Sequence, residues 1–386
     1  MSAGAADAAC KAPRNPRRPL VVKIGSSTLT TPDYRIDREY LQQVATQVAR
    51  VRAAGWSPII VTSAAIACGL EALGMDKRPD DMPSLQAAAS VGQSALSSAY
   101  AQAFAPHGIV TSLVLLTRRD TADRTAYLHA RDTFDKLLDF GVVPIVNEND
   151  TVSVEQIRFG DNDTLAALVA CLVDAELVVI LSDIEGLYDA NPRRVPDAKL
   201  IERIDAIDAD VMAMCGEAGT AAGSGGMITK VKAARVLMVA GIPMVICQGR
   251  RESVIEDAAA GKGVGTLFAA SARPHEITPK KLWIALGDAA RGALSVDAGA
   301  RHALVERGSS LLAVGVKGVE GRFDAGDIVD IKDASGHVFA RGRVSAESDE
   351  VELAEGLDQK TLAGNRLLAH LAERPLVHRD ELVVFE

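Results

Sequence analysis

The chain has 386 residues, 48% of them hydrophobic and 24% charged, so it is long enough for two globular domains with separate cores. Its net charge of −9 argues against a general nucleic-acid-binding surface, although a local pair of lysines can still bind a small anion. The five cysteines are scattered and follow no metal-binding or disulfide spacing, which indicates a reducing, cytoplasmic setting. No apolar run reaches the length of a membrane span.

The first predicted strand carries a lysine near its end. Residues 1–18, rich in Ala, Pro and Arg and without the apolar core of a secretion signal, are predicted to be a disordered tail. The apolar run 20–24 that follows predicts a buried strand. Burying the ammonium group of Lys23 costs free energy unless it reaches the end of the strand or meets an anion. The Gly-Ser-Ser sequence after it offers donors to phosphate oxygens, although a strand-end lysine taken alone is more often a surface residue.

A parallel crossover unit is predicted next. Helical spacing over 38–54 leads through a glycine to an apolar strand at 58–62. Strand, helix and strand in this order predict a parallel pair, and such sheets bind ligands at the carboxyl ends of their strands. Ser63 stands at that end, where it is either a ligand-binding hydroxyl or a helix cap.

Polar residues also follow the later strands. We predict these strands at 110–116, 142–146, 177–181 and 243–247, with helices at 86–104, 165–172 and 231–240. Asp150 follows the second of these strands, and Ser182 and Asp183 follow the third. Since the carboxyl ends of parallel strands share one edge, these side chains are expected to gather there, which independent helix capping would not favour.

Two helix starts have the chemistry of an anion or substrate site. The sequence Phe-Gly-Asp-Asn-Asp-Thr at 159–164 places Asp161, Asn162 and Asp163 at a helix start, where they are either ordinary caps or functional groups. A glycine-rich run at 219–229 precedes Lys230 and its helix. That run is either a phosphate cradle, although without P-loop spacing, or a mobile surface loop.

The C-terminal part has a different pattern. Composition changes near residue 271, and we predict a linker over 271–279 between a main domain at 19–270 and a second domain at 280–386. Short alternating runs at 313–316, 327–331 and 337–344 predict that the second domain is small and rich in β-strands.

Together these segments resemble the glutamate 5-kinases of the amino acid kinase family. The resemblance runs from about residue 19 to the C-terminus, and the tail resembles a PUA domain. It implies an α/β fold, with a mainly parallel sheet sandwiched by helices and a small β-rich domain after it. Five motifs in order carry it: VVKIGSS at 21–27, NEND at 147–150, FGDND at 159–163, DIEGLYD at 183–189 and GGMITK at 225–230.

The resemblance implies ATP-dependent phosphorylation of the side-chain carboxylate of L-glutamate, the first step of proline biosynthesis. It also implies feedback inhibition by proline and a homo-oligomer, either a tetramer or a dimer. A carboxylate is already nucleophilic at neutral pH, so such an enzyme needs no general base. It must hold two anions together and stabilise the transferred phosphoryl group.

The resemblance also implies roles for individual residues. Lys23 and Lys230 would neutralise phosphate charge, and Asp163 would hold their ammonium groups in position. Mg²⁺ would be bound by the ATP phosphates, with no protein side chain as a metal ligand. The positions that match glutamate binding are Ser63, Asp150 and Asn162, and those that match ATP binding are Lys23, Ser182, Asp183, Gly225, Gly226, Met227 and Lys230.

Three positions depart from the family pattern. Ala64 replaces a glycine, Ser182 replaces a threonine and Leu85 replaces a common lysine. If position 64 needs a positive φ, the methyl group of alanine costs about 1 kcal/mol or more. An inactive, regulatory kinase is therefore one alternative, and a kinase for another acid or for a phosphate monoester is a second.

RNA binding through the PUA-like domain is a third alternative. Residues 280–386 contain 14 Lys and Arg against 18 Asp and Glu, a net charge of −4. Binding to a phosphate backbone favours a basic face, so the composition disfavours this alternative.

Overall fold

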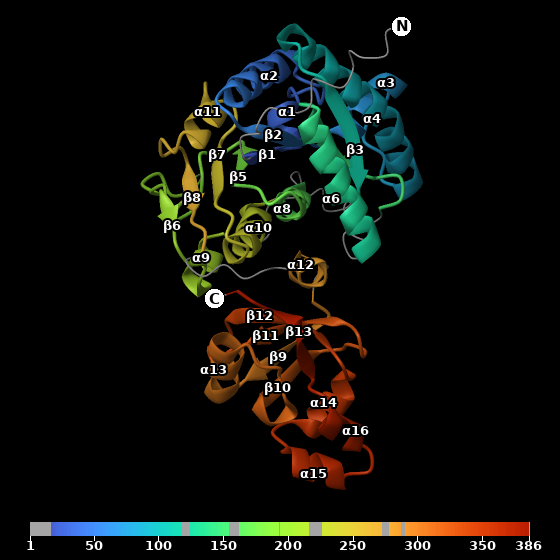
Figure 1. The fold of residues 1–386 in the computed structure, drawn as a ribbon, viewed down its shortest axis with the longest axis vertical. Coiled ribbons are helices and arrows are strands. Elements are labelled where there is room, and N and C mark those ends of the chain that lie inside the picture. Colours follow the sequence, from blue (N-terminus) through green and yellow to red (C-terminus); the bar gives the residue numbers. More distant parts are fainter. Residues whose placement is uncertain are drawn as a thin grey trace, which may run out of the picture.

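The computed structural model describes residues 17–117, 120, 123–153, 162–192, 194–215, 226–271, 278–286 and 290–385. Within them the chain forms an eight-stranded sheet in its N-terminal part and a five-stranded sheet in its C-terminal part (Figure 1). In these residues no helix combines the length and the apolar character that a membrane span requires. Most of the predicted tail, Asp161 and Gly225 lie outside the described residues.

The larger sheet has the strand order β3-β4-β2-β1-β5-β7-β8-β6, and its neighbours are parallel except for the β7–β8 pair. Its strands are β1 (Pro19–Ile24), β2 (Ser57–Val61), β3 (Thr111–Leu116), β4 (Val143–Glu148), β5 (Leu177–Ser182), β6 (Arg203–Ile204), β7 (Met244–Gln248) and β8 (Thr266–Phe268). The helices of this part are α1 (Ser26–Leu29), α2 (Arg38–Ala53), α3 (Ala65–Leu73), α4 (Met82–Phe104), η1 (Ala105–His107), α6 (Arg124–Asp139), α8 (Asn162–Leu172), α9 (Ala209–Met214), α10 (Met227–Val239) and α11 (Val254–Ala259).

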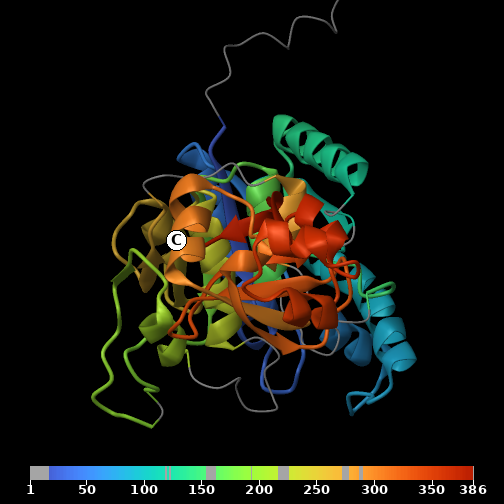
Figure 2. The ribbon, with the colours of Figure 1, turned by 90° about the horizontal axis from the view of Figure 1, so that it is seen from below.

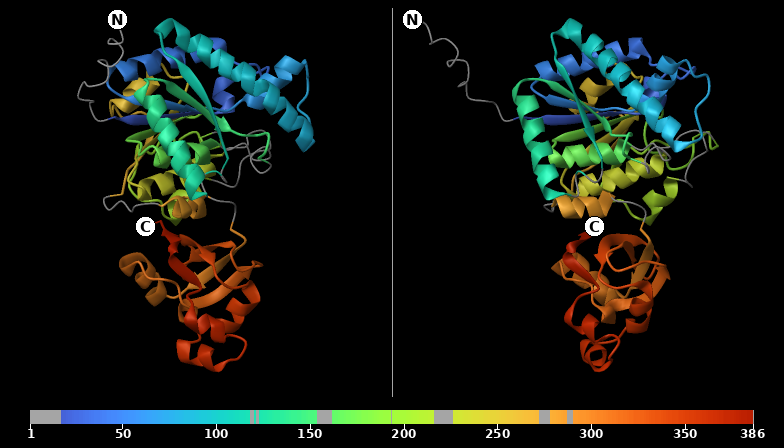
Figure 3. Two further views of the ribbon diagram at one scale, coloured as in Figure 1. Left: turned by 45° about the vertical axis from the view of Figure 1, so that its right-hand side comes forward. Right: turned by 90° about the vertical axis from the view of Figure 1, so that its right-hand side faces the viewer.

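Helices cover both faces of this sheet, as the views in Figures 1 and 3 show. Side chains alternate along β1, so Val21 packs with α8 and α10, whereas Leu20 and Val22 pack with α2 and α4. Lys23 lies two residues after Val21 and shares its face. The strand period therefore directs this lysine towards α8.

The predicted parallel sheet with helices on both faces is confirmed. Sequence analysis did not predict α3 or α6, although both are helices of nine or more residues. In α3 the reason is an almost continuous apolar and small-residue sequence that shows no clear periodicity. Two glycines bring α3 and α4 into backbone contact, because a Cβ added at Gly69 or Gly92 would lie 1.8 Å from a carbonyl oxygen of the other helix.

The C-terminal part has its own core and the strand order β10-β9-β11-β12-β13, which confirms the predicted small β-rich domain. The strand expected at 313–316 is wrong for its first three residues. They form a 3₁₀ turn, in which Gly315 lies so close to Ala300 that a Cβ would not fit. The elements are β9 (Gly292–Val296), α13 (Ala298–Arg307), η2 (Ala313–Gly315), β10 (Val316–Gly321), β11 (Ile328–Lys332), β12 (Val338–Val344), α14 (Ser348–Ala354), α15 (Gln359–Gly364), α16 (Ala369–Glu373) and β13 (Val377–Val384).

Helix α12 (Pro279–Leu286) lies between the two sheets (Figures 1 and 3). It packs against α10 on one side and β13 on the other, with Leu282 buried in the core of the larger sheet. Arg235 of α10 also reaches the C-terminal domain, where it donates to the carbonyl of Val338 at 3.3 Å and lies 3.9 Å from the ring centroid of Phe385. Seen from below in Figure 2, the C-terminal domain lies in front of the larger one.

Candidate active site

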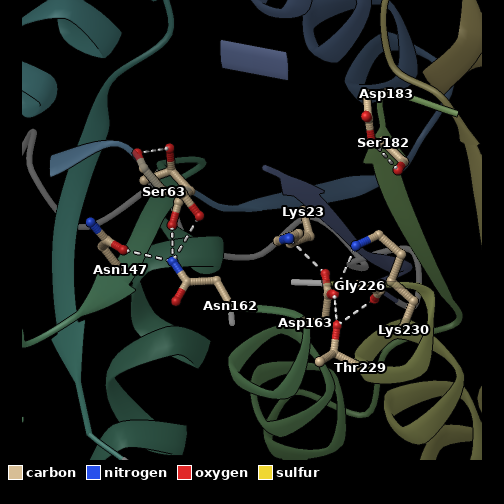
Figure 4. Close-up of polar contacts among 11 residues, drawn as sticks. Lys23, Ser63, Asn147, Asn162, Asp163, Ser182, Asp183, Gly226, Thr229 and Lys230 are labelled. Atoms are coloured by element: carbon tan, nitrogen blue, oxygen red, sulfur yellow. Dashed lines mark hydrogen bonds and ion pairs between the residues drawn. The ribbon is translucent and has the colours of Figure 1, made fainter. Parts of the chain in front are cut away.

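Two lysines and one aspartate form a buried charged cluster where three elements of the larger domain meet (Figure 4). Lys23 lies near the end of β1, Asp163 in the first turn of α8 and Lys230 in the first turn of α10. Lys23 Nζ is 2.6 Å from Asp163 Oδ1, and Lys230 Nζ is 3.0 Å from Asp163 Oδ2. The exposed fractions of these residues are 5%, 0% and 7% in chain order. We call the three residues the charged triad.

Ion pairing keeps the carboxylate of the charged triad ionised. Burial by itself would raise the pKa of the Asp163 carboxyl, but the ammonium groups of Lys23 and Lys230 hold that pKa well below its usual range. The hydroxyl of Thr229 lies 2.9 Å from Asp163 Oδ2 as a further donor. Two ammonium groups and one carboxylate leave one positive charge in excess, so the charged triad is suited to an anion.

The start of α10 adds backbone donors next to Lys230. Gly226 is the N-cap residue of this 13-residue helix, Met227 is its first residue, and a glycine has no side chain with which to cap the first turn. A bound anion can take the place of that missing cap, because the N-terminal N–H groups and the helix dipole favour negative charge. The structure thus places the described part of the predicted glycine-rich cradle beside the charged triad.

A second cluster is made of neutral amide groups and begins in the first turn of α8 at Asn162. Its Nδ2 group donates to the backbone carbonyl of Thr62 and to Ser63 Oγ at 3.1 Å. It also donates to Asn147 Oδ1 at 2.9 Å. Asn147 in turn donates from Nδ2 to Gln93 Oε1 at 2.8 Å. We call Asn162, Asn147 and Gln93 the amide relay.

Ser63 and Ala64 follow β2 at the edge of the amide relay. The N-cap residue of α3 is Ala64, so the open question about Ser63 is answered: its hydroxyl accepts from Asn162 and does not cap the helix. Ala64 has a φ of 75°, in the left-handed region that a residue with a Cβ enters at a cost. The backbone therefore does need a positive φ at this position, where the family pattern has glycine.

The remaining predicted site residues lie at two strand ends. Asp150 lies in the turn after β4, where burial raises the pKa of its carboxyl to about 6 although the charge of Arg78 acts to lower it. Ser182 is the buried last residue of β5, and its hydroxyl donates to the exposed Asp183 at 3.3 Å. In Figure 4 this pair stands apart from Asn162, on the side of the charged triad.

Sequence analysis missed two members of the amide relay. Asn147 stood inside a recognised motif, but nothing in its spacing distinguished it from the three polar residues after it. Gln93 gave no signal, because a single glutamine in an alanine-rich helix is ordinary. Among the described residues, no group of three or more His, Cys, Asp or Glu side chains is placed to hold a metal ion.

Comparison with known proteins places this geometry in a family. The amino acid kinase family profile matches residues 18–248, and the PUA domain profile matches residues 292–362. A glutamate 5-kinase of Caldanaerobacter subterraneus subsp. tengcongensis is 43% identical over 367 residues, which cover 95% of this chain and 98% of that protein. The chain belongs to the glutamate 5-kinases of the amino acid kinase family.

Other relatives agree with this membership. The glutamate 5-kinase of Azoarcus sp. strain BH72 is 46% identical over 371 residues, which cover 96% of this chain and 98% of that protein. The crystal structure of a carbamate kinase from Giardia lamblia bound to AMP-PNP covers 66% of this chain and 99% of its own, with 18% identity and a TM-score of 0.50. That likeness shows the kinase fold of the larger domain.

Proposed function

We propose that the protein transfers the γ-phosphoryl group of ATP to the side-chain carboxylate of L-glutamate, giving L-glutamyl 5-phosphate and ADP. The reaction would be the first step of proline biosynthesis. The observation that carries the proposal is the pairing of the charged triad with the amide relay at one edge of the sheet, in a chain whose relatives are glutamate 5-kinases.

The charged triad suits the phosphoryl half of this reaction. A carboxylate oxygen attacks the γ-phosphorus while the bond to the β,γ-bridging oxygen breaks and ADP leaves. Lys23 and Lys230 neutralise charge on the phosphates, and Asp163 fixes their ammonium groups so that little reorganisation is needed. No residue needs to remove a proton, because the attacking carboxylate is already ionised.

ATP would lie over the start of α10 and the end of β5. The N-terminal N–H groups of α10, from Gly226 and Met227 onwards, would bind phosphate oxygens, and Ser182 and Asp183 would contact the nucleotide. The carboxylate nearest the phosphates, Asp163, is already held by two lysines, so Mg²⁺ fits as an ion carried by the ATP phosphates. When bound, Mg²⁺ supplies further neutralisation of phosphate charge.

The amide relay and its neighbours suit the amino acid half. Ser63 and Asn162 would bind polar groups of glutamate, and Asp150 would pair with its ammonium group. By family resemblance, we also propose inhibition by proline near this site, a homo-oligomer and a cytoplasmic location. The domain limits at residues 270 and 280 stay predictions.

The proposal is tested by trapping the acyl phosphate with hydroxylamine. Wild type should form hydroxamate only with both glutamate and ATP, and Lys230→Ala should abolish it. Ala64→Gly is assayed beside them, because the strained alanine favours the inactive-kinase alternative. Hydroxamate from Ala64→Gly but none from folded wild type would support that alternative, and none from either would refute glutamate kinase activity.

A further inference from the structure

Gln93 presents a buried amide donor beside the proposed glutamate site. Gln93 is 8% exposed, and its Oε1 accepts a hydrogen bond from Asn147 Nδ2. Among the described residues, its Nε2 group has no hydrogen-bond partner. Leaving a buried donor unpaired is unfavourable, so this donor calls for an acceptor that enters the site.

Two backbone groups decide which way each amide of the relay faces. The N–H of Glu148 donates to Asn147 Oδ1 at 2.9 Å, which fixes that oxygen and turns Asn147 Nδ2 towards Gln93. Gln93 must then offer Oε1 to Asn147 and keep Nε2 as a donor. The carbonyl of Thr62 fixes Asn162 in the same way, because a carbonyl can only accept. The hydrogen bonds of Asn147 therefore determine the orientation of the Gln93 amide and leave its NH₂ group facing away from Asn147.

One face of helix α4 contacts both the amide relay and the end of β2. Gln93 and Tyr100 are seven residues apart on this helix and share a face. Tyr100, fully buried, is hydrogen-bonded through its hydroxyl to Thr62 Oγ1 at 2.7 Å. The residue before Gln93 is Gly92, and the close backbone contact there seats α4 against the start of α3. Gln93 is therefore held firmly and has little freedom to find another partner.

The position of the amide relay indicates which part of the substrate Gln93 meets. In Figure 4, Asn162 and Asn147 stand on the opposite side from Lys23 and Lys230, and Gln93 is bonded to Asn147. The reacting carboxylate of the substrate must lie near the lysines, so the group near Gln93 belongs to the other end of the molecule. In an amino diacid that end carries an ammonium and a second carboxylate.

We infer that Gln93 is a substrate-binding residue whose Nε2 donates to the carboxylate of the amino acid that is not phosphorylated. This inference rests on the proposed function and assigns the residue that recognises the α-carboxylate. Through Oε1, the same side chain also holds Asn147 and Asn162 in position.

The test exchanges the donor for an acceptor and offers a matching substrate. Gln93→Glu keeps an oxygen for Asn147 and replaces the donor by a carboxylate oxygen. Kinetic constants are measured with L-glutamate and with its α-amide, at pH 8.5 so that the new carboxyl is ionised. We expect kcat/KM for glutamate to fall by about 30-fold or more, because a charge-assisted hydrogen bond is replaced by repulsion. For the α-amide the change should be less than about threefold, since its NH₂ group can donate to the new carboxylate.

The controls separate this inference from its alternatives. Gln102→Glu adds the same charge to the exposed face of α4 and should change neither constant. If Gln93→Glu fails to fold, Gln93→Met takes its place. Because it removes both polar atoms, it should lower kcat/KM for glutamate more than kcat/KM for the α-amide. An equal fall with both substrates would show a structural role only, and unchanged constants would show that Nε2 meets a buried water; either result overturns the inference. A wild type without glutamate-dependent hydroxamate would instead refute the proposed function itself.

Discussion

The charged triad and the amide relay begin at neighbouring residues of one helix turn, Asp163 and Asn162, yet they differ in almost every physical respect. Asp163 joins a cluster of full charges, in which ion pairs compensate for complete burial. Asn162 joins a cluster of neutral amides, in which directed hydrogen bonds set each orientation. The contrast matches the two proposed substrates, since a triphosphate needs charge neutralisation and an amino acid needs its groups to be told apart.

The first turn of α8 contributes a residue to each cluster. Residues that follow each other in the first turn of a helix point about 100° apart, so consecutive side chains reach different neighbours. Asp163 reaches the end of β1 and the start of α10, whereas Asn162 reaches the ends of β2 and β4. A shift of one residue at the start of α8 would place Asp163 in the position of Asn162 and take its carboxylate away from the two lysines.

The largest expected effect comes from removing the charge at the centre of the triad. Asp163→Asn leaves two buried ammonium groups without their anion, which should lower the free energy of unfolding by about 3–5 kcal/mol. Chemical denaturation measures this change. ATP should raise the melting temperature of the variant more than that of wild type, because its phosphates replace the missing anion. Equal free energies of unfolding for Asp163→Asn and wild type would show that the ion pairs of the charged triad do not stabilise the fold.

Lys230→Met should remove phosphoryl-transfer activity and leave the fold intact. Asp163 keeps Lys23 as an ionic partner, and the methionine fills the volume of the lost side chain. We expect kcat to fall by about 100-fold to 1,000-fold, as is typical when one preorganised charge is lost. Steady-state kinetics measures kcat, and circular dichroism checks the fold. A fall in kcat of less than tenfold would mean that groups other than Lys230 neutralise the charge of the phosphates.

Asn162→Ala should act on the amino acid and spare the nucleotide. The substitution removes the donor shared by Ser63, Asn147 and the Thr62 carbonyl. We expect KM for glutamate to rise by about 10-fold to 30-fold, corresponding to one or two hydrogen bonds, with KM for ATP changed less than twofold. A rise in KM for ATP of the same size would break the proposed division between the clusters.

Asp150, which we propose pairs with the ammonium group of glutamate, should make glutamate binding sensitive to pH. Burial raises the pKa of its carboxyl to about 6, so the group is ionised above that pH and protonated below it. We expect kcat/KM for glutamate to fall as the pH drops through about 6, because the ammonium group of glutamate then loses its anionic partner. Asp150→Asn should remove this step from the pH profile, and Asp76→Asn, at an exposed carboxyl, should keep it.

The same raised pKa also has a consequence for stability. The folded protein binds the Asp150 proton more tightly than the unfolded chain, so its contribution to stability is lost as the pH rises from 3.8 to about 6. Above pH 6, Asp150→Asn should therefore melt at a higher temperature than wild type. A lower melting temperature of the variant at pH 7 would contradict the raised pKa of the Asp150 carboxyl.

The smallest expected effect is at Ala64. Ala64→Gly removes the strain of a left-handed alanine but adds conformational entropy to the unfolded chain, so the net gain in the free energy of unfolding should be about 0.5–1 kcal/mol. Thermal denaturation measures it. Ala54→Gly, at the end of α2 with a φ of −81°, is the matched control and should lower stability instead. A lower free energy of unfolding for Ala64→Gly would contradict the proposed backbone strain at Ala64.

The sequence predicted most of the larger sheet and half of its site. Lys23 and Asp163 stood out as charged residues beside apolar runs, but only the family resemblance implied that they meet in one cluster. The amide relay could not be predicted in full, because Asn147 and Gln93 are neutral residues whose role depends on contacts between elements far apart in the chain. The helix α6 could have been predicted, because Tyr127, Phe134 and Leu138 repeat at helical spacing among charged residues.

The most direct test of the division between the clusters is glutamate binding without nucleotide. Isothermal titration of L-glutamate into wild type, Lys230→Met and Asn162→Ala separates binding from phosphoryl transfer. We predict that Lys230→Met binds glutamate as wild type does, within about twofold, and that Asn162→Ala binds it about tenfold or more weakly. Equal weakening in both variants, or wild-type affinity in Asn162→Ala, would contradict the assignment of charge to the phosphates and of the amides to the amino acid.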